Sequence, residues 1–268
     1  MTVEEDLSRF IPPPPGEDMT IWRYLDFTKF VALLDSKALF FARVSTLDDP
    51  FEGSFPPAQS VKERLMGAFP LGSLPDNVSI EVESGVEDIW RIMRYWAMVN
   101  CWHASTHESA AMWRLYAPTT AAVAIRSTVR RLRSAIGSAP APPAGFGGSD
   151  RVHIGMIEYL DFATQRIPDG SFAAQFFRKR RSFEHERELR ALVLQFPRAA
   201  DDPRRVDYAR RPTDTGLSIP ADLSQLVEQV LVAPQAPGWY AELVARVAVK
   251  YGLQVVPTQS ELDAKPLY

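Results

Sequence analysis

Short runs of apolar residues predict most of the strands of this chain. Residues 191–194 are all apolar, which is typical of a strand buried on both faces. Runs rich in aromatic and branched side chains predict further strands. They lie at 21–25, 38–43, 99–103, 121–125, 152–160 and 254–256.

Apolar residues three and four positions apart predict amphipathic helices. In the clearest, 239–251, Leu243, Val247 and Tyr251 share one stripe, and Gly252 is placed to end the helix. The same spacing predicts helices at 28–36, 86–99, 108–116, 129–136 and 172–183. Helices and strands interleave without a regular strand-helix-strand rhythm. The pattern therefore predicts an α+β fold whose sheet is mixed or antiparallel.

Composition predicts one domain with two less ordered segments. The chain has 268 residues, of which 46% are hydrophobic, enough for one large core. Residues 1–19 include a run of four prolines and predict a flexible, extended leader. Residues 137–150 are rich in Gly, Ala, Pro and Ser and predict a mobile loop. We therefore expect a single domain over 20–268.

Charge and cysteine content indicate the kinds of binding partner and the cellular compartment. The net charge is −3, so the molecule as a whole is not built to bind polyanions. Cys101 is the sole cysteine, so no internal disulfide can form, as is usual in a reducing compartment. The acidic N-terminal sequence does not resemble a secretory signal, and no apolar run is long enough to span a bilayer. We expect a soluble cytoplasmic protein that does not bind membranes.

The richest chemistry lies between Lys179 and Arg190. Glu186, Glu188 and Arg190 are spaced by two, so a strand would place all three on one face. Paired carboxylates suit acid–base work or the stabilisation of an oxocarbenium ion. Lys179 and Arg190 suit a phosphate-bearing substrate. The same residues would equally form a structural ion-pair network, and the sequence leaves both interpretations open.

An acidic turn precedes this segment by more than a hundred residues. Asp48, Asp49 and Glu52 surround Pro50, a pattern typical of a turn. Their oxygens could bind a divalent cation, but no further acidic cluster nearby completes such a site, so no metal is predicted. A loop that faces a substrate is the other interpretation, in which Asp49 and Glu52 contact the ligand.

Aromatic residues offer a second binding surface. Trp113 and Tyr116 are three apart and share a helix face, which would suit stacking on a base or a nicotinamide ring, or a plain core stripe. Arg23 stands in an otherwise aromatic strand beside Tyr24, and if buried it needs an acidic partner or a ligand. Glu186, Glu188 and Asp49 are the candidate partners.

The order of these segments resembles a widespread bacterial family of unknown function. The resemblance spans residues 21–262 and rests on four motifs: Trp22-Arg23-Tyr24, Asp49-Pro50-Phe51-Glu52, Met112-Trp113-x-x-Tyr116 and Lys179-x-x-x-Phe183-x-x-Glu186-x-Glu188-x-Arg190. Phe183 stands where that family usually has tryptophan, and Cys101-Trp102-His103 replaces a shorter Phe-Ser. The family implies no particular activity.

A weaker resemblance is to ADP-ribosyltransferases, whose Arg–Ser–Glu order matches Arg23, Ser105 and the pair Glu186 and Glu188. It implies NAD as substrate, an oxocarbenium ion stabilised by Glu188 and an acceptor oriented by Glu186. It further implies that Arg23 holds a phosphate of NAD. Stacking on nicotinamide would fall to an aromatic side chain: Tyr24, Trp113 or Tyr116.

The leading hypothesis is therefore an enzyme that processes NAD or a nucleotide, in a toxin or phage-defence setting. One alternative is a nucleic-acid-binding or nuclease-like protein, if its arginine-rich segments share a surface. Those arginines are Arg130, Arg131, Arg133, Arg178–Arg181, Arg204, Arg205, Arg210 and Arg211. The other alternative is a non-catalytic interaction domain. The oligomeric state does not follow from the sequence.

Overall fold

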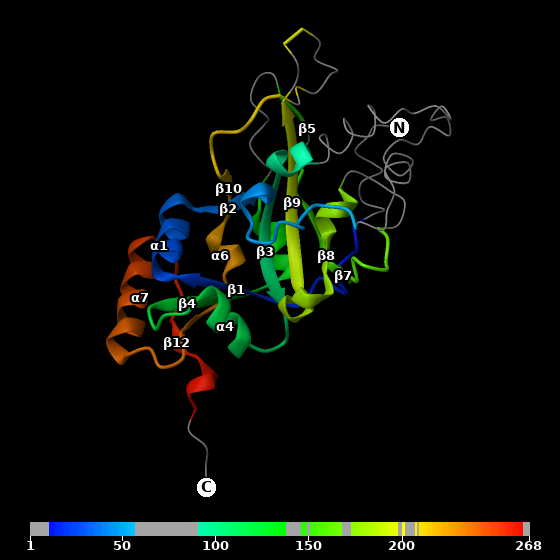
Figure 1. Cartoon of the computed structure of the whole chain (residues 1–268). Coiled ribbons are helices and arrows are strands. Elements are labelled where there is room, and N and C mark those ends of the chain that lie inside the picture. The colour runs from blue at the N-terminus through cyan, green and yellow to red at the C-terminus, as the bar shows by residue number, and fades with distance from the viewer. Residues whose placement is uncertain are drawn as a thin grey trace, which may run out of the picture.

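A ten-stranded sheet forms the centre of the fold (Figure 1). The computed structural model describes residues 11–56, 91–137, 146–148, 151–167, 173–197, 200–201, 207 and 209–264. The strands of this sheet are β1 (Thr20–Asp26), β2 (Ala38–Arg43), β3 (Ala97–Ala104), β4 (Ala122–Thr128), β5 (Phe146–Gly148), β6 (His153–Met156), β9 (Glu188–Pro197), β10 (Gly216–Pro220), β11 (Gln229–Val232) and β12 (Thr258–Gln259). A separate two-stranded sheet joins β7 (Glu158–Leu160) to β8 (Arg178–Arg180). The predicted α+β class is confirmed.

Strand β3 organises the sheet because it has neighbours along both edges. Strand β9 runs antiparallel to it over its length, from Ala97 opposite Leu194 to His103 opposite Glu188. The other edge of β3 is shared by β2 at one end and β1 at the other. The path continues from β1 through β4 to β11 and β12, and among the described pairs in this sheet the last is parallel.

Helices cover the sheet unequally. They are α1 (Phe27–Ser36), α4 (Ala110–Tyr116), α5 (Val129–Ala135), α6 (Leu223–Leu226) and α7 (Gly238–Lys250). Side chains of α1, α5, α6 and α7 join one large apolar cluster with Leu189, Ala191 and Val193 of β9. We call this the helix-covered face. Figure 1 shows α1 and α7 to the left of β9, with β7 and β8 to its right.

The opposite face of β9 carries Glu188, Arg190, Leu192 and Leu194, and we call it the charged face. Helix α4 packs on this side, where Met112 and Trp113 contact Trp22 and Tyr24 of β1. A second apolar cluster joins Leu192 and Leu194 to Phe176 and Phe177. The charged residues of β9 therefore lie between two apolar clusters.

Most predicted elements are present. The strands predicted at 21–25, 38–43, 99–103 and 121–125 correspond to β1, β2, β3 and β4, and the helices predicted at 28–36, 108–116, 129–136 and 239–251 correspond to α1, α4, α5 and α7. Asp26 caps α1 by accepting a 2.7 Å hydrogen bond from the Lys29 amide. Such a cap satisfies one of the free amides of the first turn.

Several predicted elements are wrong. The helix predicted at 172–183 is instead a 3₁₀ turn, η3 (Ala174–Phe177), then β8, then a second 3₁₀ turn, η4 (Arg181–Glu186). The strand predicted at 152–160 divides into β6 and β7, and β12 forms two residues beyond the strand predicted at 254–256. The helix predicted at 86–99 ends at Trp96, where β3 takes over, and its first five residues lie outside the described part.

The predicted leader is held at its second half. Ile11 is buried, and the Met156 amide donates a 2.7 Å hydrogen bond to the Pro12 carbonyl. A Cβ on Gly155 would collide with Ile11 and Pro12, so a glycine there allows the close approach. Residues 1–10, like most of the loop predicted at 137–150, lie outside the described part. No described helix has the length and apolar character needed to cross a bilayer.

Candidate functional site

The candidate site begins where the chain enters β9. Glu188 and Arg190 lie on the charged face, as their spacing predicts, opposite His103 and Cys101 of β3. Glu186 reaches the same place by another route, because it ends the η4 turn rather than extending the strand. Arg187, with a φ of 43°, makes the left-handed turn between the two segments. The prediction that a strand holds all three is therefore wrong for Glu186.

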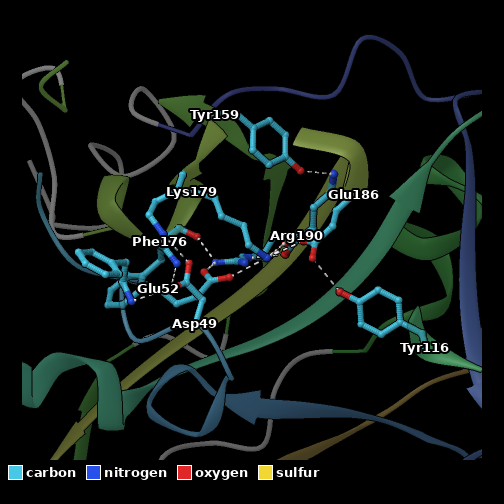
Figure 2. Close-up of polar contacts among 11 residues, drawn as sticks. Asp49, Glu52, Tyr116, Tyr159, Phe176, Lys179, Glu186 and Arg190 are labelled. Carbon is cyan, nitrogen blue, oxygen red and sulfur yellow. Dashed lines mark hydrogen bonds and ion pairs between the residues drawn. The ribbon is translucent and has the colours of Figure 1, made fainter. Parts of the chain in front are cut away.

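Five charged side chains meet here and form what we call the ion cluster: Glu52, Lys179, Glu186, Glu188 and Arg190 (Figure 2). Lys179 Nζ lies 2.9 Å from Glu52 Oε1, 2.5 Å from Glu186 Oε2 and 3.5 Å from Glu188 Oε2. Arg190 Nε lies 2.6 Å from Glu188 Oε1, and its Nη1 lies 3.0 Å from Glu52 Oε2. Arg190 Nη1 also donates to the Phe176 carbonyl at 2.7 Å.

Mutual attraction keeps Glu188 and Lys179 charged despite their burial. Burial alone raises the pKa of Glu188, but the charges of Arg190 and Lys179 outweigh it and hold that pKa below its ordinary value. Burial lowers the pKa of Lys179, but Glu188, Glu52 and Glu186 outweigh it and raise the pKa. The ion cluster thus joins three carboxylates to two cations, and the positive charge of Arg94 also acts on Glu52.

The ion cluster reaches a half-exposed side chain through Glu186. The Tyr116 hydroxyl donates a 2.9 Å hydrogen bond to Glu186 Oε1, and Tyr116 is 46% exposed. Burial and the Glu186 charge raise the pKa of Tyr116, so the phenol keeps its proton at neutral pH. Glu186 itself is 7% exposed and Glu188 is 4% exposed, so both carboxylates are buried. Arg190 and Lys179 contact the two oxygens of Glu188, whereas Glu186 is the carboxylate of this set that contacts Tyr116.

The structure separates the two aromatic residues of α4. Trp113 is 3% exposed and packs edge-on against Tyr24, with ring centroids 5.0 Å apart. Tyr24 is also buried, and its hydroxyl oxygen accepts a 2.7 Å hydrogen bond from the Ser109 amide. Tyr24 and Trp113 thus form part of the core beneath α4, while Tyr116 is half-exposed.

Glu108, just before α4, ties this helix to a distant part of the chain. Its Oε2 accepts hydrogen bonds from Trp113 Nε1 at 2.8 Å and from Ser260 Oγ at 2.6 Å. Its Oε1 accepts from the Glu261 amide at 2.7 Å. Residues 260–261 therefore fix the start of the helix that carries Tyr116.

Arg23 lies away from the ion cluster. Trp22 pairs with His103, which is on the charged face, so the next residue, Arg23, points to the helix-covered face. Its guanidinium lies 5.8 Å from the centroid of the Trp102 ring. Its Nη1 is buried without a hydrogen-bond partner, and burial lowers the pKa of Arg23 to about 10. The predicted pairing of Arg23 with Glu186, Glu188 or Asp49 is wrong.

Ser105 makes no described hydrogen bond to the carboxylates. Its carbonyl accepts a 2.9 Å hydrogen bond from Trp22 Nε1, and its hydroxyl accepts one from the His107 amide at 3.2 Å. These contacts organise the turn between β3 and α4. The Arg–Ser–Glu order that suggested an ADP-ribosyltransferase layout is therefore not assembled in space.

The acidic turn divides its residues between two roles. Asp49 accepts a hydrogen bond from the Phe51 amide at 3.0 Å and pairs with Arg180 at 2.7 Å, as a structural turn would. Glu52 enters the ion cluster and links Lys179 to Arg190. Within the described residues, no group of three or more His, Cys, Asp or Glu side chains is arranged to hold a metal ion.

Two residues near Glu186 and Glu188 were not predicted from the sequence to belong to the site. Tyr159 of β7 accepts a 2.8 Å hydrogen bond from the Glu188 amide through its hydroxyl oxygen. His103 Nδ1 lies 2.6 Å from the Glu186 carbonyl, and burial lowers the pKa of this histidine. Both residues come from predicted strands, but nothing in their local sequence indicates which distant backbone they contact.

Two of the arginine-rich segments, those around Arg130 and Arg178, lie on different faces of the sheet. Arg130 and Arg133 of α5, over the helix-covered face, pair with Asp18 and Glu17. Arg178 and Arg180 lie by the charged face and pair with Glu158 and Asp49. Arg204 and Arg205 lie outside the described residues. This removes the geometric basis for the predicted stripe between these two segments.

No protein-family model and no curated protein matches the chain, so the resemblance to a bacterial family stays a prediction. The comparison with solved structures finds weak matches to DarT from Thermus sp. 2.9. The complex with NAD⁺ has a TM-score of 0.39 and 8% identity, covering 93% of this chain and 99% of that chain. The complex with ADP-ribosylated single-stranded DNA has a TM-score of 0.36 and 9% identity, covering 93% and 95%. Similarity at this level does not establish a common fold. A proposed function must therefore rest on the contacts within this chain.

Proposed function

We propose that this protein cleaves the bond between nicotinamide and ribose in NAD and transfers the ADP-ribosyl group, with Glu186 as the reacting carboxylate. The observation that carries the proposal is the contact between Glu186, a carboxylate of the buried ion cluster, and the half-exposed Tyr116. The nicotinamide ring of NAD is cationic, and an oxocarbenium ion develops as it leaves. A fixed carboxylate is the group that stabilises such a cation.

The contacts around Glu186 support this role. Lys179 engages Oε2, while Oε1 accepts the hydrogen bond of the half-exposed Tyr116. Lys179 is itself held by Glu52 and Glu188, so the reacting carboxylate cannot rotate freely. Preorganisation of this kind avoids rearrangement when the cation forms.

This assignment moves the stabilisation of the oxocarbenium ion from Glu188 to Glu186. The resemblance implied that role for Glu188, but Arg190 and Lys179 contact both oxygens of Glu188, whereas Oε1 of Glu186 contacts Tyr116. Glu188 and Arg190 become positioning residues for Lys179 and Glu186 in this scheme. A purely structural ion-pair network is the competing interpretation, since such networks also hold buried charges.

The test is to incubate the purified protein with NAD and quantify free nicotinamide by mass spectrometry. Glu186→Gln keeps the shape of the side chain and a contact to Lys179 but removes the charge. We expect it to slow nicotinamide release by about 10²-fold or more. Glu184→Gln is the matched control, because Glu184 is an exposed glutamate of the same 3₁₀ turn. Equal release by wild type and Glu186→Gln, or none by either, would leave the structural network as the explanation.

A further inference from the structure

Tyr116 occupies the place that an acceptor would take in this reaction. Its hydroxyl donates to Glu186 Oε1 at 2.9 Å, and the residue is half-exposed. An acceptor hydroxyl needs a carboxylate within hydrogen-bonding reach to take its proton as the new bond forms. A ribose C1′ drawn to Glu186 Oε1 would also lie against Tyr116 Oη, because these two oxygens are in contact.

Tyr159 provides an internal contrast. It also lies at the ion cluster, but its hydroxyl oxygen accepts from the Glu188 backbone amide. Among the described contacts, its hydroxyl does not donate to a carboxylate of the ion cluster. Two tyrosines at one site thus differ in whether a base can take the phenolic proton.

Helix α4 holds Tyr116 in this position. At its start, Tyr24 accepts from the Ser109 amide and Glu108 accepts from Ser260 and Glu261. At its end, the Ala117 amide donates to the Trp113 carbonyl at 3.0 Å, which closes the last turn. The hydroxyl is therefore presented by a short helix that is fixed to the sheet and to residues 260–261.

We propose that Tyr116 is a self-modification site, which accepts an ADP-ribosyl group from NAD. The inference rests on the proposed function. The bond between C1′ and the nicotinamide nitrogen breaks, and its electron pair leaves with neutral nicotinamide. A lone pair of Tyr116 Oη forms the new bond to C1′, and the phenolic proton passes to Glu186. The product is an O-glycosidic tyrosine, and no oxidant, reductant or metal takes part in this balance.

The experiment incubates wild-type protein with NAD and maps the products by tandem mass spectrometry after proteolysis. We expect one ADP-ribosyl mass on the peptide that contains Tyr116, and none on the peptide that contains Tyr159. Tyr116→Phe keeps the ring and should abolish the adduct at that peptide. A glycosidic bond to a phenol withstands neutral hydroxylamine, whereas an ester bond to a carboxylate is cleaved, so this treatment should leave the adduct in place.

Free nicotinamide in the same reactions separates the two proposals. Nicotinamide release with an adduct on Tyr116 supports both. Nicotinamide release without that adduct, or with an adduct that hydroxylamine removes, overturns the self-modification and leaves the proposed function standing. An adduct of equal yield in Tyr116→Phe also overturns it. Absence of nicotinamide release overturns both.

Discussion

The two faces of β9 use adjacent residues for opposite purposes. Leu189, Ala191 and Val193 join the large apolar cluster beneath the helices, while Glu188 and Arg190 enter the ion cluster. Burial of apolar surface contributes about 25 cal/mol per Å² toward folding. A buried ion pair is often no more stable than an apolar pair of the same size, because both ions lose their hydration. The helix-covered face therefore supplies stability, and the charged face fixes a polar geometry.

Removal of one cation from the charged face should cause the largest loss of folding stability. Arg190→Met leaves Lys179 alone to compensate the buried Glu52, Glu186 and Glu188, which should lower the free energy of unfolding by about 3–5 kcal/mol. Urea denaturation followed by circular dichroism measures this difference. Arg181→Met, at an exposed position of η4, is the control and should change stability by less than about 0.5 kcal/mol. Similar stability of the two variants would mean that the ion cluster does not depend on Arg190.

The next largest effect should come from acid, which should remove stability that the charged face contributes but not stability that the helix-covered face contributes. The folded-state pKa of Glu188 lies below its ordinary value of 4.5, so its contribution to stability is complete above that value. The contribution is lost as the pH falls through the folded pKa. We expect wild type to lose stability as the pH falls below 4.5, and Glu188→Gln to lose less.

A variant of the helix-covered face provides the comparison for that titration. Leu189→Ala should be less stable than wild type by about 2–5 kcal/mol at neutral pH, because it leaves a cavity. Its further loss in acid should equal that of wild type, because Leu189 carries no proton. Denaturation curves at several pH values measure all three proteins. A Glu188→Gln curve parallel to wild type would contradict the role of Glu188.

The smallest change in stability is expected when an arginine of the helix-covered face, Arg23, is replaced by methionine. Arg23 has a buried, unpaired Nη1, so Arg23→Met removes a costly group rather than a partner. Stability should stay within about 1 kcal/mol of wild type or rise. Urea denaturation beside Arg190→Met tests this directly, and a loss as large as that of Arg190→Met would show that Arg23 has a partner that compensates its charge.

The elements that the sequence predicts well are those whose pattern reflects burial on one side. Strands such as β2 and helices such as α7 follow this rule, because each has one face in the large apolar cluster. The segment 172–183 was wrongly predicted as one helix because its phenylalanines have helical spacing. In the structure Arg178 and Lys179 are buried there, paired with Glu158 and the ion cluster. Partners so far along the chain leave no local periodicity to detect.

The site residues also divide into those that local spacing predicts and those that only tertiary folding brings together. Glu188 and Arg190 were predictable as neighbours because their spacing of two holds in β9. The contact of Glu52 with Arg190 joins residues 138 positions apart, and only tertiary folding brings them together. Arg23 and Tyr24 could have been separated from sequence alone, since adjacent strand residues point to opposite faces. The left-handed turn at Arg187 has no such signal, because arginine rarely adopts that conformation.

The hydrogen bonds of Glu108 also bear on the order in which the protein acquires its shape during synthesis. Ser260 leaves the ribosome 152 residues after Glu108, so α4 emerges long before its second anchor exists. Until then Tyr24 alone, of these two anchors, can hold the start of the helix. A nascent chain that has passed β4 but not residue 261 should therefore present Tyr116 on a loosely held helix. The polar geometry at Glu186 is then completed late in translation, after most of the sheet has been made.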